Sequence, residues 1–390
     1  MIEITDNRGL KELGQKLANL DFFTLDTEFI REKTYYPILA LVQVSWHGQG
    51  PILIDPLEIS DWSPFHDALL NPSICKVFHA GRQDLEIFHH QMQAMPQNLF
   101  DTQIVASMCG YGEQIGYSGL VAKVLGVHLT KGNSYSNWLQ RPLTAAQLNY
   151  ARDDVKYLPE LYERLSAVAQ TKSRTQWIRQ ETGAQLNESL FNPNPDQLWT
   201  KVKKAGTLKS KNAAVLRELA KWRDATARAA NRPIRFILSD EVLIELSKIE
   251  KLTLEQLISR RGLQGRFVDR YGQTLLDLHA KARALPKTEW PFFGNPRRKP
   301  PSGRIEILAD LAWLLIKEIA READIAPTHL ISKKDLPYFV EAYTQNEDLS
   351  PFSLSQGWRK EMVGELLFRL LEGRLLLQVK NHRLVWQEQA

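Results

Sequence analysis

The chain has 390 residues, of which 43% are hydrophobic and 24% charged, and this length allows two or three domains. Its two cysteines, Cys75 and Cys109, exclude a disulfide framework and the usual zinc spacings, and so favour a reducing cytoplasm. No apolar run is as long as a membrane span, and residues 1–6 lack the features of a signal peptide, so we expect a cytoplasmic protein without membrane contacts.

Strand and helix signals alternate through the first half of the chain. Runs rich in branched and aromatic residues predict strands near residues 22–28, 38–46, 51–55 and 75–79. Apolar residues at helical spacing predict helices near residues 62–70, 83–92, 102–109, 117–125 and 144–167. Strands that come first, mostly linked by hairpins, and are followed by helices indicate a mixed α/β sheet flanked by helices.

Two carboxylates lie on the first predicted strand. Side chains alternate along a strand, so Asp26 and Glu28 share one face, while Leu25 and Thr27 point to the other. Two carboxylates on one face of a buried strand repel each other, and a bound cation would make them tolerable. The ordinary alternative is a strand that ends in solvent.

A second pair of polar groups lies on the helix predicted at residues 144–167. Tyr150 and Asp154 are four residues apart, so they lie on one face beside the apolar stripe of this helix. Asp153 points about a quarter turn away from Asp154, and its role stays open. A third group, Asp84, follows the strand predicted at residues 75–79.

Together these residues suit a metal-dependent nuclease. Magnesium prefers oxygen ligands, and two divalent ions can stabilise both oxygens of an in-line displacement at phosphorus. Each pattern alone has a simpler explanation, such as a solvated carboxylate, a helix cap or a chance pair.

The order and flanks of these residues resemble ribonuclease D, of the DEDDy branch of the DnaQ-like 3′-to-5′ exonucleases. The three matching motifs are Asp26-Thr27-Glu28-Phe29, His79-Ala80-Gly81-Arg82-Gln83-Asp84-Leu85-Glu86 and Tyr150-Ala151-Arg152-Asp153-Asp154-Val155. Further similar stretches are Thr34-Tyr35-Tyr36-Pro37, Asp101-Thr102-Gln103 and Trp138-Leu139-Gln140-Arg141-Pro142-Leu143. The resemblance implies a ribonuclease H-like fold for the first half of the chain.

It also implies roles for individual residues. Asp26, Glu28, Asp84 and Asp154 would bind two Mg²⁺ or Mn²⁺ ions, and Tyr150 would orient the attacking water. A phenol with a pKa near 10 is a poor base at neutral pH, so positioning is its expected role.

The same resemblance suggests the substrate and two residues that contact it. Phe29 suits packing against the terminal nucleotide, although a core phenylalanine is equally consistent with the sequence. Lys131 matches a position near substrate phosphate, although a solvated loop lysine is the simpler interpretation. The expected reaction releases nucleoside 5′-monophosphates from single-stranded 3′ ends of RNA, with tRNA precursors and other structured RNA as the expected substrates and no obligate protein partner.

Two proline-rich linkers divide the rest of the chain. The first is Phe191-Asn192-Pro193-Asn194-Pro195, and the second runs over residues 286–301. The block after the first linker resembles the HRDC (helicase and RNase D C-terminal) domain, a small helical bundle, and the last block resembles it more weakly. The predicted domains are an exonuclease domain at 1–190, an HRDC domain at 205–290 and a second, divergent all-α HRDC-type domain at 300–390.

Charge is distributed unevenly between these parts. Residues 1–190 contain 16 Lys and Arg against 21 Asp and Glu, whereas residues 191–390 contain 34 against 24. A basic second half attracts nucleic acid without regard to sequence. On the helix predicted at Ala213–Asn231, Arg217, Lys221 and Arg228 share a face, which indicates RNA contact. A solvated charged face is the alternative.

Two other functions remain open at this point. The same site could digest DNA, because RNA is told from DNA through the 2′-OH, and no residue can be assigned to that contact. The chain could also be a nucleic-acid-binding scaffold with an idle nuclease fold, although all four carboxylates and Tyr150 are present.

Overall fold

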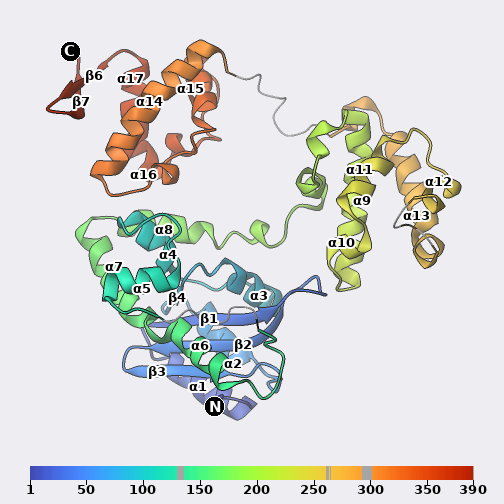
Figure 1. The fold of residues 1–390 in the computed structure, drawn as a ribbon, viewed down its shortest axis with the longest axis horizontal. Helices are drawn as coiled ribbons and strands as arrows, with labels where there is room; N and C mark the ends of the chain where they lie inside the picture. The colour runs from blue at the N-terminus through green and yellow to red at the C-terminus, as the bar shows by residue number, and fades with distance from the viewer. Residues whose placement is uncertain (130–135, 261–262, 264, 292–300, 390) are drawn as a thin grey trace.

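A five-stranded mixed sheet forms the centre of the first half of the chain in the computed structural model, which describes residues 1–129, 136–260, 263, 265–291 and 301–389 (Figure 1). The strands are β1 (Phe22–Ile30), β2 (Ile38–Trp46), β3 (Gln49–Ile54), β4 (Cys75–Phe78) and β5 (Leu99–Asp101), in the order β3-β2-β1-β4-β5. The pairs β1/β2 and β2/β3 are antiparallel, whereas β1/β4 and β4/β5 are parallel. The mixed sheet expected from the sequence is therefore confirmed.

Helices cover both faces of this sheet. The helices of the first half are α1 (Asn7–Leu17), α2 (Ser63–Leu70), α3 (Arg82–Met92), α4 (Thr102–Met108), α5 (Tyr117–Leu125), α6 (Ala145–Lys156), α7 (Leu158–Thr171) and α8 (Thr175–Ala184). One core joins α1, α2 and α3 to the sheet, while α6 and α7 lie against β1 and β2 on the other side. The single helix expected at 144–167 is interrupted at Tyr157, because α7 begins anew with Pro159 in its first turn. The sequence prediction missed α1, α8 and β5.

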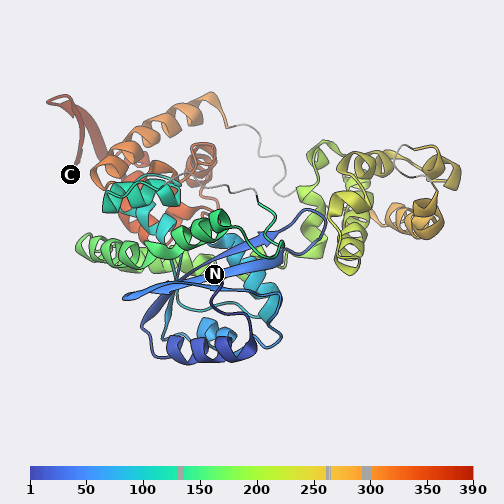
Figure 2. The same cartoon turned by 60° about the horizontal axis from the view of Figure 1, so that its bottom comes forward.

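The middle block is helical and has its own apolar core. Its elements are η2 (Pro195–Lys201), α9 (Ser210–Ala229), α10 (Ile234–Ile237), α11 (Asp240–Lys248), α12 (Leu254–Ile258) and α13 (Arg266–Arg283). The side chain of Ser239 caps α11 by accepting a hydrogen bond from the backbone N–H of Val242. In Figures 1 and 2 this block projects to one side of the sheet.

The last block combines helices with a strand pair. It contains α14 (Gly303–Glu322), α15 (Leu336–Thr344), α16 (Gly357–Arg359) and α17 (Glu365–Leu371), and ends in the antiparallel hairpin of β6 (Leu375–Lys380) and β7 (Arg383–Glu388). The expectation of an all-α block is therefore wrong for its final residues. The hairpin forms because Asn381 and His382 both adopt positive φ, of 51° and 61°, which suits a two-residue turn between twisted strands.

The last block shares a core with the first half of the chain. Buried residues of α4, α5, α7 and α8 form one apolar cluster with those of α14, α15 and α17. At its edge, the Arg359 guanidinium donates to both carboxylate oxygens of Glu181, at 2.6 and 2.8 Å. The rings of Trp177 and Trp358 stack beside this pair with centroids 4.9 Å apart. The C-terminal block is thus part of the structure that supports the sheet.

The middle block meets the first half of the chain through the tip of the β1–β2 hairpin (Figure 1). The Tyr35 hydroxyl donates to Asp224 of α9 at 2.7 Å, and the guanidinium of Arg228 lies 5.0 Å from the Tyr35 ring centroid. The backbone N–H of Tyr35 donates to the side chain of Asn231. Within the described ranges, no helix is both long and apolar enough to cross a bilayer.

Candidate active site

The first two candidate ligands lie on the central strand of the sheet. Asp26 is paired with Gln43 of β2, and Glu28 with Leu41, and the regular register up to Glu28 puts both carboxylates on one face. A β-bulge follows between Glu28 and Phe29, so the strand changes direction directly after the second carboxylate. Both side chains are partly exposed.

Asp84 reaches the same place from the first turn of α3. It is only 6% exposed, and the Thr27 hydroxyl of β1 donates a hydrogen bond to its carboxylate. The loop before α3 is strained at Ala80, whose φ is 57°. Asp101 stabilises this loop by accepting hydrogen bonds from the backbone N–H groups of Ala80 and Gly81, at 3.0 and 3.1 Å. Asp101 therefore fixes the position at which α3 begins, and with it the position of Asp84 in the first turn.

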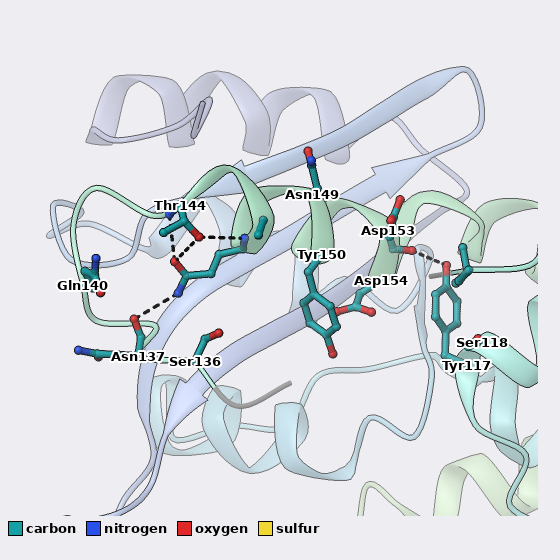
Figure 3. Close-up of a pocket in the computed structure, with 13 residues that line it drawn as sticks. Tyr117, Ser118, Ser136, Asn137, Gln140, Thr144, Asn149, Tyr150, Asp153 and Asp154 are labelled. Atoms are coloured by element: carbon teal, nitrogen blue, oxygen red, sulfur yellow. Dashed lines mark hydrogen bonds between the residues drawn. The ribbon is translucent and has the colours of Figure 1, made fainter. Parts of the chain in front are cut away.

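Tyr150 and Asp154 come from α6, which begins in a capping box made by Thr144 and Gln147. Figure 3 shows the Tyr150 ring and the Asp154 carboxylate side by side, while Asp153 points away from them. The two groups are close enough that Asp154 helps to raise the pKa of Tyr150, while Tyr150 partly offsets the rise in the pKa of Asp154. The backbone carbonyl of Asp153 accepts a hydrogen bond from Tyr117 at 2.9 Å, so the main chain at this residue supports α5.

The four carboxylates are close enough to perturb one another. Burial, followed by the charges of Asp26, Asp154 and Asp84, raises the pKa of Glu28 to about 9. Burial and then Asp154 raise the pKa of Asp26 to about 8. The pKa of Asp154 rises to about 7, mainly through burial, and burial and then Asp26 hold the pKa of Asp84 well above its usual range. Burial, followed by the neighbouring carboxylates, also raises the pKa of the Tyr150 phenol.

No described cation offsets this concentration of negative charge. The ion pairs between described residues include none of Asp26, Glu28, Asp84 and Asp154. In the part of the chain that the structure describes, no three His, Cys, Asp or Glu side chains are arranged as they would be around a bound metal ion. The chemistry of these four carboxylates nevertheless fits a divalent metal ion, because all their donor atoms are oxygens and none of them forms an ion pair with a described residue.

A cavity of about 810 Å³ opens beside these groups (Figure 3). Its walls include Tyr150, Asp154, Tyr117, Asn137 and Gln140, so hydroxyl and amide groups surround the carboxylate end. The sequence analysis did not single out Tyr117 or Asp101. Asn137 and Gln140 lie in or next to the stretch 138–143, and Asp101 is the first residue of the stretch 101–103. The resemblance of these two stretches to ribonuclease D could have pointed to these residues.

The candidate substrate-binding residues that the structure describes lie on two elements, β1 and α9. Phe29 is partly buried against the core on the α1–α3 side of the sheet. Lys131 lies outside the described residues. Each of the three cations of α9 forms an ion pair within the chain: Arg217 with Glu218, Lys221 with Asp196 and Arg228 with Asp224. Their charges are therefore partly compensated, and RNA contact by these residues stays a prediction.

Comparison with known proteins decides the family. A family model described as 3′-5′ exonuclease matches residues 1–170, and an HRDC domain model matches residues 212–278. The chain is 35% identical to ribonuclease D of Gluconacetobacter diazotrophicus over 97% of its own length and 95% of that protein. It is 36% identical to ribonuclease D of Pseudomonas paraeruginosa, over 95% of the chain and 97% of the relative. The chain belongs to the ribonuclease D family.

A solved structure agrees with this assignment. The crystal structure of Escherichia coli RNase D, described as an exoribonuclease involved in structured RNA processing, is 32% identical and matches with a TM-score of 0.83. The match covers 96% of this chain and 99% of that one. The chain is thus a ribonuclease D-type hydrolase of the DnaQ-like 3′-to-5′ exonuclease group, with a ribonuclease H-like domain and an HRDC domain.

Proposed function

We propose that this ribonuclease D-family chain hydrolyses RNA one nucleotide at a time from the 3′ end and releases nucleoside 5′-monophosphates. The observation that supports the proposal is that Asp26, Asp154 and Asp84 are near enough to Glu28 to add to the effect of burial on its pKa, beside a cavity that Tyr150 and Asp154 line. The RNase D of Escherichia coli, similar over nearly the whole chain, is an exoribonuclease, which favours RNA over DNA.

The proposed cofactors are two divalent ions, Mg²⁺ or Mn²⁺, bound by Asp26, Glu28, Asp84 and Asp154. When bound, such ions lower the pKa of water and neutralise charge on the phosphate oxygens. The pKa values of Glu28 and Asp26, raised first by burial and then by neighbouring carboxylates, support this assignment, because a divalent cation would stabilise the ionised form of both groups.

Tyr150 has a positioning role in this proposal. Its raised pKa keeps the phenol protonated at neutral pH, so it does not act as a base. The phenol lies beside Asp154, and the lone pairs of its oxygen can accept a hydrogen bond from the attacking water. Thr27 holds Asp84 in a comparable way from the strand.

The proposed substrates are tRNA precursors and other structured RNA with single-stranded 3′ ends. The Escherichia coli RNase D takes part in structured RNA processing, and the whole-length similarity supports carrying this substrate class over.

The proposed domains are 1–190, 205–290 and 300–390. We infer that the last is a divergent HRDC-type domain extended by the β6–β7 hairpin. No obligate protein partner is needed, and the cytoplasm is the compartment that two free cysteines favour.

The test is digestion of a 5′-labelled single-stranded RNA, with and without Mg²⁺, beside a DNA oligonucleotide of the same sequence. A ladder that shortens one nucleotide at a time from the 3′ end, requires Mg²⁺ and forms faster on RNA is expected. Internal cleavage, or digestion that continues unchanged in EDTA, would contradict the proposal. Faster digestion of the DNA would show that the protein is a deoxyribonuclease instead.

A further inference from the structure

A second cavity, of about 430 Å³, lies between α3, the end of β1 and the middle block. It begins next to the candidate active site but shares none of the residues that line the first cavity. Arg31 lies three residues beyond Glu28, and Arg82 lies two residues before Asp84. A chain spans at most about 3.6 Å per residue, so the Cα atom of Arg31 lies within roughly 11 Å of that of Glu28.

A stacked aromatic pair forms part of its wall. The rings of Tyr36 and His90 have centroids 3.7 Å apart and planes only 6° apart. His90 is exposed although Tyr36 covers one of its faces, so its other face is open. Burial, followed by His89 and Arg228, lowers the pKa of His90 against the opposing effect of Glu86, which favours the neutral imidazole. An open, neutral aromatic face is what an unpaired base stacks on.

Two cations of the cavity have no acidic partner among the described residues. Arg31 is paired with Glu86, and Arg228 with Asp224. Arg82 lines the cavity from the start of α3 and Lys201 from the end of η2, and neither forms an ion pair with a described residue. The acidic groups are thus neutralised locally, and two positive charges remain for a ligand.

We propose that this groove binds a nucleotide of the RNA upstream of the scissile bond, with its base stacked on His90 and its phosphates contacted by Arg82 and Lys201. This inference rests on the proposed function, because a strand that ends at the carboxylates must leave along a neighbouring surface. Stacking and charge together favour single-stranded nucleic acid over a peptide. The middle block then contributes through Lys201 at the groove.

The test compares a dinucleotide, which ends before the groove, with an RNA of eight nucleotides. His90→Ala and Arg82→Gln should each lower the ratio of kcat/KM on the longer RNA to kcat/KM on the dinucleotide by about tenfold, a loss typical of one stacked base or phosphate contact. His90→Phe keeps an aromatic face and should restore most of the ratio. Arg8→Gln removes an exposed cation on α1, away from the groove, and should leave both rates unchanged.

Binding of a 5′-labelled RNA, followed by fluorescence anisotropy in Ca²⁺, gives a second readout. Arg82→Gln should reduce the slope of log affinity against log salt by about 0.7, the value expected for one lost phosphate contact on a single strand. An unchanged rate ratio in His90→Ala together with an unchanged salt slope in Arg82→Gln would overturn the inference. In that case the parent protein would still digest both RNAs, whereas failure of the proposed function would leave neither RNA digested.

Discussion

The carboxylates of the candidate site hold protons at neutral pH in the absence of metal, and a bound divalent cation would replace those protons. Asp26→Asn and Asp154→Asn each remove one of these charges with little change in side-chain volume. Loss of groups that merely support metal ligands typically costs 10–100-fold, so we expect kcat/KM on RNA to fall by more than about a hundredfold in each variant. Asp67→Asn, on the exposed surface of α2, is the matched control. Near-normal turnover in either test variant would refute the assignment of that residue.

The same charges should destabilise the metal-free fold at high pH. Unfolding returns the pKa of Asp26 from about 8 to near 3.8, so the folded state holds more protons between these values and its stability falls as pH rises. In EDTA, Asp26→Asn should therefore melt a few degrees above the parent protein at pH 9. The difference should shrink towards pH 5, where the parent carboxyl is protonated. Thermal melts at both pH values measure this, and a variant that melts below the parent at pH 9 would contradict it.

At the scale of elements, the position of α3 depends on a side chain that does not touch the carboxylates. Asp101→Ala removes the acceptor for the backbone N–H groups of Ala80 and Gly81 and the cap of α4. Loss of a cap alone costs about 1 kcal/mol. We expect half-maximal activity to require about 10–100-fold more Mg²⁺, because Asp84 is no longer held in place. A Mg²⁺ titration of activity measures this, and an unchanged midpoint in the folded variant would rule the role out.

Some of the helices and strands could be predicted from the sequence, and others could not. The strand expected at 22–28 and the helical stretch expected at 144–167 were predictable because apolar periodicity and motif spacing are local properties, although the stretch forms two helices that meet at Tyr157. The supporting role of Asp101 could not be predicted, because it depends on contacts between the end of β5 and the loop before α3. The β6–β7 hairpin was missed although Leu375, Leu377 and Val379 alternate, since its turn residues, Asn381 and His382, do not include the usual glycine.

At the scale of the molecule, the last block and the exonuclease half share one core, while the middle block has its own. Contacts between residues more than 100 positions apart leave no mark in local periodicity, so the sequence alone could not show this. Leu367 and Leu219 are both fully buried, the first in the shared core and the second in the middle block. Leu→Ala costs about 2–5 kcal/mol at such positions.

These two leucines give a matched test of the shared core. Leu367→Ala should lower the temperature at which hydrolysis of a dinucleotide is lost, whereas Leu219→Ala should leave this temperature close to that of the parent protein. Thermal inactivation curves of the three proteins measure the difference. Equal shifts in both variants would show that the two cores unfold together.

The account as a whole depends on whether Asp26, Glu28, Asp84 and Asp154 bind divalent ions together. A crystal of the protein soaked in Mn²⁺ and measured for anomalous scattering tests this directly. We predict two strong peaks within bonding distance of oxygens from these four carboxylates, next to the Tyr150 hydroxyl. Peaks elsewhere on the molecule, with no peak among these carboxylates, would contradict the account.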